Sequence, residues 1–511
     1  MSTPRNELTE AMDEQGNRRP DVENTTRGRL GRRSFIKLAA GGVALGAAGA
    51  AGFGQLTRST SPRRPVRLTA TVTGRVREWH FAATDGYVAM PDPTIVAPVG
   101  VYYPDLLAPE GQNLYIFGFN DITDIAGFAG SNLSAPWVPD SLVAPIDFKT
   151  LAQISGPLLY CDDGDDIRLK LENLGLGVRP DLFDPHTVHW HGFANQIPYF
   201  DGVPDASLSV PSGSELIYRY MPVDVGTYMY HCHVEDVEHV HMGLTGMIFV
   251  RPSETALNSA GNATKWSEAG LATGKKYAYY DISTEYDREY AILLTEANVE
   301  NHWNDGHIQE SDWSEYRPTF GLMNGRSWPD TIELNGSFFD RDNFSATPNG
   351  SWRDSQLSAA VAARLAYQPN SSLIQANDGE KVLLRISNLG FDEHSLILPG
   401  LEMTMVGADA KFLGEGRPDY FPDGLDRNDI TTKTYRIDLG PGESRDLIFT
   451  APTPVSVAHD VYPFYDRSIL FRKKAPSSSS PLDGFGAMRT EVHIHPLGAL
   501  NAQAHPNQLF V

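Results

Sequence analysis

The chain has 511 residues, 41% of them hydrophobic, and a net charge of −22 at neutral pH. This length is enough for two or three domains with separate cores. The strong acidity argues against nucleic acids and anionic membrane surfaces as partners, because both are negatively charged. It mildly favours cationic or neutral substrates, although solubility alone explains such a charge. The 35 prolines and 46 glycines are typical of sandwich domains whose strands are joined by many turns.

The first 60 residues differ from the rest, because they carry nine Lys and Arg against six Asp and Glu. Residues 31–54 place Arg32 and Arg33 before an apolar run rich in Ala and Gly, which resembles a twin-arginine export signal. The run is short and weakly hydrophobic, so we expect no permanent membrane span. We expect export of the folded protein to the periplasm, the cell surface or the medium. The alternative is a disordered basic tail.

Two segments about forty residues apart gather side chains that favour copper. HTVHWHG spans residues 186–192 and YHCHVEDVEHVHMGLTGM spans residues 230–247, and together they hold seven of the 15 histidines and one of the two cysteines. Thiolate sulfur and imidazole nitrogen together are typical copper ligands. A lone cysteine in a strand is more often a small buried apolar side chain, but histidines flank this one on both sides. We therefore predict a copper site here.

Strand geometry divides these side chains between two faces. Successive side chains of a strand point to opposite sides of its sheet. If both segments are extended, four histidines converge on one face, and one cysteine and one histidine converge on the other. The first set is His189, His191, His231 and His233, and the second is Cys232 and His186.

The face with Cys232 and His186 needs a third ligand, which a turn after the strand can return. We predict that His239 is this ligand. Two histidines and one cysteine, with a weak or absent axial ligand, form a blue-copper electron-transfer site. The four histidines on the other face would form half of a second copper site. The backbone of Cys232 would connect the two sites.

These motifs, together with DGVP at residues 201–204, resemble those of the multicopper oxidases, the laccase group. The resemblance implies copper as cofactor, oxygen as electron acceptor, and a phenol, an aromatic amine or a metal ion as donor. It also implies that Asp201 helps deliver protons near the site of oxygen reduction. The implied ligand roles are His186 and Cys232 at type 1 copper, His189 at type 2 copper, and His191, His231 and His233 at the type 3 pair.

The chain departs from the family pattern after the cysteine. The second type 1 histidine of the family follows the cysteine by five residues, but Val237 stands there. His239 takes this role if two residues are inserted. The axial methionine position then holds Leu244, as in laccases that lack this ligand, and Met242 and Met247 are the alternatives.

The chain also contains an internal repeat. DGDDIRLKLENLG at residues 163–175 recurs as DGEKVLLRISNLG at 378–390, and VPSGSELIYRYMP at 210–222 recurs as LGPGESRDLIFTAP at 439–452. Each copy contains alternating strands, so we predict an all-β chain of two cupredoxin-type Greek-key β-sandwich domains.

The second copy lacks the copper motifs. HSLILPG stands where HTVHWHG stands in the first copy, so Ile397 and Pro399 replace His189 and His191. Neither replacement can bind copper. We therefore predict that the second domain is structural and that His394 is a hydrogen-bonded core residue.

The repeat leaves the oxygen-reducing cluster of the family incomplete within one chain. That cluster takes eight histidines from two domains, whereas the motifs here supply four. A homo-oligomer would have to complete it, or the protein would hold fewer coppers. His493 and His495 have the spacing of a pair on one strand face, but they lie away from the matching motif, and we do not assign them to a metal site.

The state of the second cysteine follows from the copper prediction. Since Cys232 is assigned to metal, we expect Cys161 to be a free buried thiol, and the alternative is a disulfide between Cys161 and Cys232.

The domain boundaries follow from the motifs and the repeat. We predict a signal and disordered tail over 1–60, a copper-binding domain over 65–255 with an insertion of surface loops and extra strands at about 85–150, a linker over 253–275, a second domain over 276–498, and a tail over 499–511 that docks on a neighbour or is disordered.

Three functions remain open. The first is an exported laccase-like oxidase. The second is an enzyme like copper nitrite reductase, with a single type 2 copper at His191, His231 and a ligand from a neighbouring subunit. Against it, His189 stands where that family has an aspartate, and His233 has no role. The third is a blue-copper electron carrier or copper store.

Overall fold

The computed structural model describes residues 75–91, 100–123, 149–193, 199–258, 261–336, 357–415, 429–468 and 485–510. The predicted export signal and part of the predicted insertion lie outside these ranges. Among the described residues, no helix is long and apolar enough to cross a membrane.

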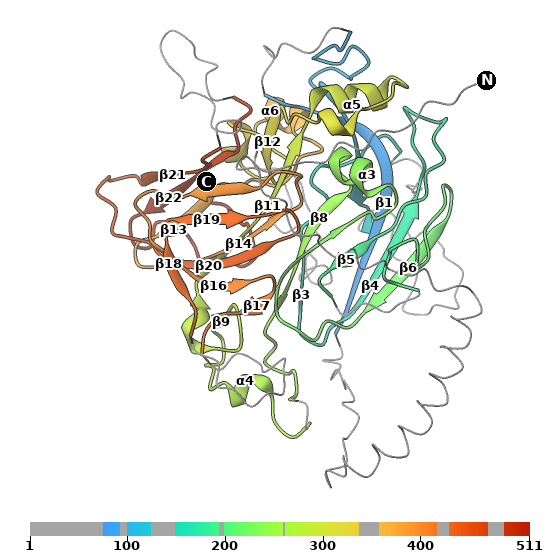
Figure 1. Ribbon diagram of the computed structural model, residues 1–511. Coiled ribbons are helices and arrows are strands. Elements are labelled where there is room, and N and C mark those ends of the chain that lie inside the picture. The colour runs from blue at the N-terminus through green and yellow to red at the C-terminus, as the bar shows by residue number, and fades with distance from the viewer. Residues whose placement is uncertain are drawn as a thin grey trace, which may run out of the picture. The chain divides into compact units, whose positions relative to one another are not determined.

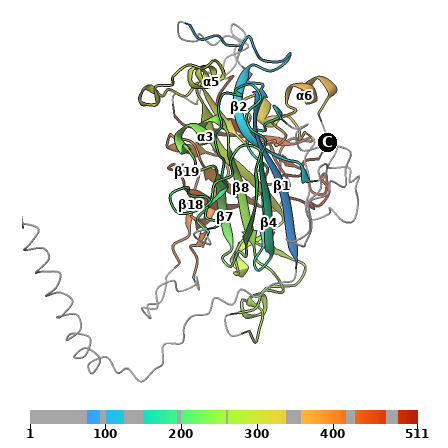
Figure 2. The same ribbon diagram turned by 90° about the vertical axis from the view of Figure 1, so that its right-hand side faces the viewer.

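The described strands form two pairs of sheets (Figure 1). In the first pair, the order β2-β1-β4-β6 faces the order β3-β8-β7-β5, and one apolar core that includes Trp79, Phe117 and Trp190 draws on both sheets. β1 and β4 run parallel, side by side, in Figure 2. The strands are β1 (Val76–Val88), β2 (Leu114–Asp121), β3 (Leu159–Asp162), β4 (Asp166–Asn173), β5 (His189–His191), β6 (Glu215–Tyr220), β7 (Gly226–His231) and β8 (Thr245–Arg251).

The second pair of sheets has its own apolar core, which includes Leu384, Phe449 and Ile494. One sheet has the order β12-β11-β14-β20-β16-β17, with β18 beside β16, and the other has the order β13-β22-β21-β15-β19. The strands are β11 (Arg288–Ala297), β12 (Phe320–Met323), β13 (Ile374–Asn377), β14 (Lys381–Asn388), β15 (His394–Ile397), β16 (Met403–Ala408), β17 (Lys411–Phe412), β18 (Thr432–Thr434), β19 (Arg436–Leu439), β20 (Ser444–Thr450), β21 (Asp460–Asp466) and β22 (Arg489–His495).

The two pairs of sheets repeat one topology. β1 is parallel to β4 as β11 is to β14, and β3 is parallel to β8 as β13 is to β22. The repeated segments of the sequence form corresponding strands. The prediction of an all-β chain with two β-sandwiches is therefore confirmed.

Short elements connect or cover the sandwiches. β9 (Lys276–Tyr277) pairs with β10 (Glu285–Tyr286) as a separate ribbon. The helices are α3 (Asp236–Met242), α4 (Lys265–Glu268), α5 (Val299–Gly306) and α6 (Ala359–Arg364). α4 lies within the segment predicted as a linker and buries Trp266 against Tyr277.

Part of the segment predicted as an insertion of surface loops and extra strands, at about 85–150, lies in the core of the first sandwich. β1 continues to Val88, and every residue of β2 is buried. β2 is the outer strand of its sheet, but α3 and α5 pack against it, so its apolar sequence LYIFGFND is covered. This part of the segment therefore belongs to the core of the first sandwich.

The described part of the C-terminal tail, which was predicted to dock on a neighbour or to be disordered, packs on its own chain. β12 pairs with β11 only from Leu294 onward. Earlier in β11, the tail takes the place of β12. The side-chain amide of Gln503 accepts from the backbone N–H of Glu289 at 2.7 Å and donates to the backbone carbonyl of Glu289 at 3.2 Å. Asn507 makes the same pair of bonds with Ala291, at 2.7 and 2.8 Å. The tail thus satisfies a strand edge that would otherwise be exposed.

A buried polar network joins the two sandwiches behind β7. The hydroxyl of Thr227 donates to Asp446 at 2.5 Å, and Tyr279 donates to the other carboxylate oxygen at 2.5 Å. The guanidinium of Arg385 donates to Thr227 at 3.1 Å and pairs with Glu289 at 2.7 Å. These contacts hold the strand that carries His231 against the second sandwich.

Candidate metal centre

The structure brings Cys232, His186 and His239 together in the core of the first sandwich. All three are 0% exposed. The sulfur of Cys232 lies 3.3 Å from Nδ1 of His239 and 3.9 Å from Nδ1 of His186, and one ligand atom from each residue lies within 4.8 Å of the other two. The predicted group of one cysteine and two histidines is therefore a compact, dry cluster.

Three different segments position these side chains. His186 forms an isolated β-bridge with Val210, three residues before β5. Cys232 directly follows β7, and its N–H donates to the carbonyl of Leu244 at 3.0 Å. His239 comes from α3, so a short helix returns it where we predicted a turn. The helix follows Glu235, which has a left-handed backbone with φ of 44°.

The donor set and its surroundings fit copper. Burial alone would raise the pKa of the Cys232 thiol, but hydrogen bonds with His186 and His239 outweigh burial and hold this pKa well below its usual value. The backbone N–H of Thr187 also donates to the sulfur, at 3.4 Å. A buried thiolate with two imidazoles is the ligand set of a blue-copper site.

The candidates for an axial ligand divide between two cores. Leu244 and Met242 belong to the same apolar core as Cys232, and both are fully buried. Met247 packs in a different cluster, with Met229 and Leu293, between the sandwiches. This packing favours Leu244 or Met242 as the residue next to the site.

Four histidines gather in a second group beside the first, as strand parity predicted. His189 of β5 pairs in register with His231 of β7. The ring centroid of His189 lies 5.3 Å from the centroids of the His231 and His233 rings, and 6.0 Å from the centroid of the His191 ring. In the described part of the chain, the ring contacts of these four residues are with one another.

Hydrogen bonds from outside this group orient two of its rings. Nδ1 of His189 lies 2.7 Å from the carbonyl oxygen of Asp201, whose carboxylate is 3.7 Å away. Nδ1 of His231 lies 2.8 Å from the carbonyl oxygen of Cys232. Both contacts leave Nε2 available for a metal ion. Burial lowers the pKa of His231 to about 3, so its imidazole is neutral, the form that binds metals.

The second sandwich approaches the four-histidine group with other residues. A Cβ atom on Gly442 would lie 3.0 Å from the ring of His191. Burial lowers the pKa of His191, and the nearby carboxylate of Asp409 opposes this shift only in part. Gly442 lies in the turn that repeats the segment around Gly213 of the first sandwich. Among the described residues, no histidine of the second sandwich makes a ring contact with this group.

The second sandwich carries an ion pair at the place that corresponds to the Cys232 site. His394 corresponds to His186, and its Nδ1 lies 2.8 Å from Asp466, which corresponds to Cys232. The N–H of Ser395 donates to Asp466 at 3.3 Å, as Thr187 donates to Cys232. Nε2 of His394 lies 2.5 Å from Glu296. The prediction that His394 is a hydrogen-bonded core residue is confirmed.

Both cysteines are free and buried, which confirms the prediction for Cys161 and removes the rival disulfide. The sequence interpretation missed Thr187 and Asp184. Thr187 accepts from the N–H of His233 at 2.9 Å, and Asp184 lies 3.9 Å from Nε2 of His239. Thr187 lies inside the HTVHWHG motif, and a hydroxyl between two ligands is the signal that could have found it.

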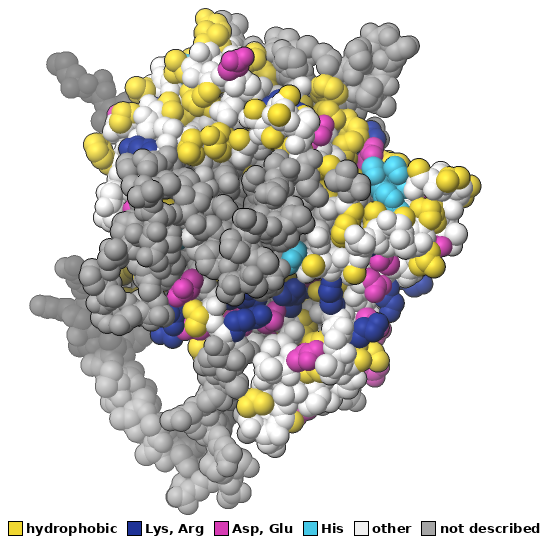
Figure 3. Space-filling view, turned by 180° about the vertical axis from the view of Figure 1, so that it is seen from behind, with side chains coloured by type: hydrophobic (Ala, Val, Ile, Leu, Met, Phe, Trp, Pro, Cys, Tyr) yellow, Lys and Arg dark blue, Asp and Glu magenta, His cyan; other side chains and the backbone are white. Residues whose placement is uncertain are grey.

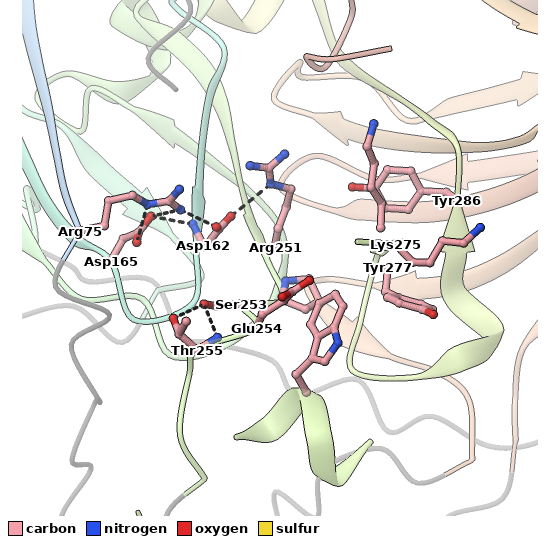
Figure 4. Close-up of a pocket in the computed structure, with 13 residues that line it drawn as sticks. Arg75, Asp162, Asp165, Arg251, Ser253, Glu254, Thr255, Lys275, Tyr277 and Tyr286 are labelled. Carbon is pink, nitrogen blue, oxygen red and sulfur yellow. Dashed lines mark hydrogen bonds and ion pairs between the residues drawn. The ribbon is translucent and has the colours of Figure 1, made fainter. Parts of the chain in front are cut away.

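A cavity of about 420 Å³ lies apart from both groups (Figure 4). Arg75 pairs with Asp162 and Asp165 on one side, and Arg251 pairs with Asp162 at 3.2 Å. Lys275 and tyrosines of the β9–β10 ribbon form the opposite wall. None of its lining residues is a predicted copper ligand.

The chain is similar in sequence to known copper oxidases over part of its length. A family model described as multicopper oxidase matches residues 151–255, which include both histidine motifs. Residues 151–255 are therefore similar to a multicopper oxidase domain. Multicopper oxidase MCE of Talaromyces pinophilus is 23% identical over 298 residues, which cover 53% of this chain and 48% of that protein.

Two further similar proteins come from bacteria. Copper resistance protein A of Escherichia coli is 26% identical over 293 residues, covering 52% of this chain and 39% of that protein. The blue copper oxidase of Nitrosomonas europaea is 17% identical in a superposition with a TM-score of 0.47, covering 82% of this chain and 86% of that one. The chain spans less than half the length of these two curated relatives.

Proposed function

We propose that the protein is an exported oxidoreductase of the multicopper oxidase type, which oxidises a small donor and reduces oxygen. The donor would be a phenol, an aromatic amine or a metal ion. His186, Cys232 and His239 would hold a type 1 copper, and the four-histidine group would hold a second copper site. Copper bound at these sites would take electrons singly from the donor and deliver them to oxygen.

The observation that carries this proposal is the covalent connection between the two groups. Cys232 contributes its sulfur to the first group, and its chain neighbours His231 and His233 belong to the second. The path from the sulfur to either imidazole therefore runs through a few bonds of one short segment. An isolated electron-transfer site would have no need of two histidines placed around its cysteine.

The remaining residues hold the groups in position and handle protons. Asp201 orients His189 through its carbonyl and keeps a carboxylate within 3.7 Å of the ring. We propose that this carboxylate, 12% exposed, passes protons from solvent toward the four-histidine group. Thr187 keeps the backbone of His233 and the sulfur of Cys232 in fixed relation.

A second candidate is a blue-copper electron carrier. The observation that favours it is the approach of Gly442 and Asp409 to the four-histidine group, where the family has further histidines. In this case the four histidines would hold no copper that reacts with oxygen.

Copper content and spectra decide between the two candidates. We expect more than one copper per chain, an intense blue absorption, and oxygen uptake with a phenolic donor. Cys232→Ser should abolish the blue absorption, whereas His189→Ala should keep it and stop oxygen uptake. One copper per chain without oxygen uptake would support the electron carrier, and normal turnover by His189→Ala would refute the assignment of the four-histidine group.

A further inference from the structure

A third group of histidines lies on the second sandwich, on the neighbouring strands β21 and β22. The register pairs Val461 with His493 and Asp460 with Ile494, and His459 directly precedes β21. Because side chains alternate along a strand, His493 and His495 share one face of β22, while Val492 and Ile494 are buried on the other. Continuing the register by one residue puts His459 opposite His495, on that same face.

These three imidazoles converge closely. The ring centroid of His459 lies 4.5 Å from that of His493, with the rings stacked at 16°, and 4.9 Å from that of His495. One nitrogen from each residue lies within 4.8 Å of the other two. Three nitrogens bound to one tetrahedral Zn²⁺ are about 3.3 Å apart. Binding one ion therefore requires the nitrogens to approach one another by at most about 1.5 Å.

We propose that His459, His493 and His495 form a mononuclear site for a divalent transition metal ion. The site shares no residue with the Cys232 group or with the four-histidine group. Three imidazoles without a carboxylate or a thiolate favour Zn²⁺ or Cu²⁺ over Mg²⁺ or Ca²⁺.

Two neighbouring contacts support a metal site over a chance cluster. Nε2 of His493 lies 2.9 Å from the carboxylate of Glu491, two residues earlier on the same face. A carboxylate on the far nitrogen is the usual partner of a histidine that binds metal, because it fixes the ring and its tautomer. Nε2 of His495 is buried without a hydrogen-bond partner in the described structure, so it is available as a ligand.

The site is accessible from solvent. All three histidines are partly exposed, and the side chain of His493 is 16% exposed. β21 and β22 lie at the left of Figure 1, and histidine side chains gather on the surface at the right of Figure 3, which shows the molecule from behind. A metal ion can therefore enter after folding, and water can complete its coordination, as in metal sites with three protein ligands.

The test uses Zn²⁺ as the probe and the full-length protein, loaded with copper and then dialysed against a mild chelator, so that copper stays at the buried Cys232 group and leaves the exposed imidazoles. We expect calorimetric titration to show one Zn²⁺ bound per chain, with affinity reduced at least tenfold by His459→Gln and by His493→Gln. The control His307→Gln changes a histidine that pairs with Asp105 elsewhere, and it should bind Zn²⁺ as the unmodified protein does. An unchanged blue absorption would show that each variant has folded.

Two results would overturn the proposal. One is Zn²⁺ binding by His459→Gln that equals that of the unmodified protein. The other comes from crystals of the unmodified protein soaked in Zn²⁺, which need no variant to fold. Anomalous diffraction should place the ion between the three imidazoles, and a signal found only elsewhere would refute the site.

Discussion

At the scale of single residues, the internal repeat shows which side chains make the first sandwich a candidate metal centre. Cys232 and Asp466 occupy corresponding places, each next to a histidine and each accepting a backbone N–H from the residue after that histidine. The thiolate is a soft ligand that copper prefers, whereas the carboxylate forms an ion pair with His394. The same backbone therefore holds a candidate copper site in one copy and a structural ion pair in the other.

This ion pair predicts a pH-dependent stability. Burial alone would lower the pKa of His394, but hydrogen bonds with Asp466 and Glu296 outweigh it and raise this pKa to about 9. The pKa of His394 in the folded protein lies above its unfolded value of about 6.5. The charged imidazole therefore contributes its full stabilisation of the folded state below pH 6.5, and this stabilisation is lost as pH rises through 9. We expect the free energy of unfolding to fall by about 3 kcal/mol over this range.

Urea unfolding followed by circular dichroism at a series of pH values measures this loss. His394→Gln should be less stable at pH 6 and should show a flatter profile between pH 6.5 and 9. Parallel profiles for the variant and the unmodified protein would mean that His394 is not charged in the native state.

At the scale of elements, strand parity predicted most of the centre because it depends only on local sequence. His189 and His231 face each other in the register that alternation requires. The helix that returns His239 was not predictable, since it depends on the left-handed backbone at Glu235. The approach of His459 to His493 depends on how β21 and β22 pair. This pairing was not predicted, because the two strands are separated in the sequence.

The contact between β7 and the second sandwich predicts a large effect for one substitution. Asp446 is 1% exposed, accepts two hydroxyl hydrogen bonds and lies 3.6 Å from the guanidinium of Arg385. Asp446→Asn keeps the shape but leaves the buried Arg385 with less compensation, so we expect a loss of about 2–3 kcal/mol in the free energy of unfolding. Chemical denaturation measures it.

Asp438→Asn is the matched control. Asp438 pairs with Arg436 at 2.7 Å, but both side chains are about half exposed, and we expect a loss of no more than about 1 kcal/mol. Equal losses for the two variants would show that the network behind β7 does not hold the sandwiches together.

At the scale of the whole molecule, the repeat made the all-β architecture predictable, because each copy carries its own alternating strands. The docking of the tail was not predictable, since side-chain amides of Gln503 and Asn507 take the place of a neighbouring strand. Polar residues near a chain end give no sign of such a role. The burial of β2 was missed because its cover comes from two helices distant in sequence.

The position of the candidate metal centre predicts how copper affects the stability of the whole molecule. The Cys232 group is buried in the main core of the first sandwich, so unfolding that core would release a metal ion bound there. A ligand that binds only the native state stabilises it by mass action, by about 2.7 kcal/mol when free copper exceeds the dissociation constant 100-fold. We expect removal of copper by a chelator to lower the midpoint of thermal unfolding, and restored copper to raise it again.

Cys232→Ser should show a smaller shift of this midpoint, while the control His307→Gln should show the full shift. Superimposable unfolding curves with and without copper would contradict a buried copper site.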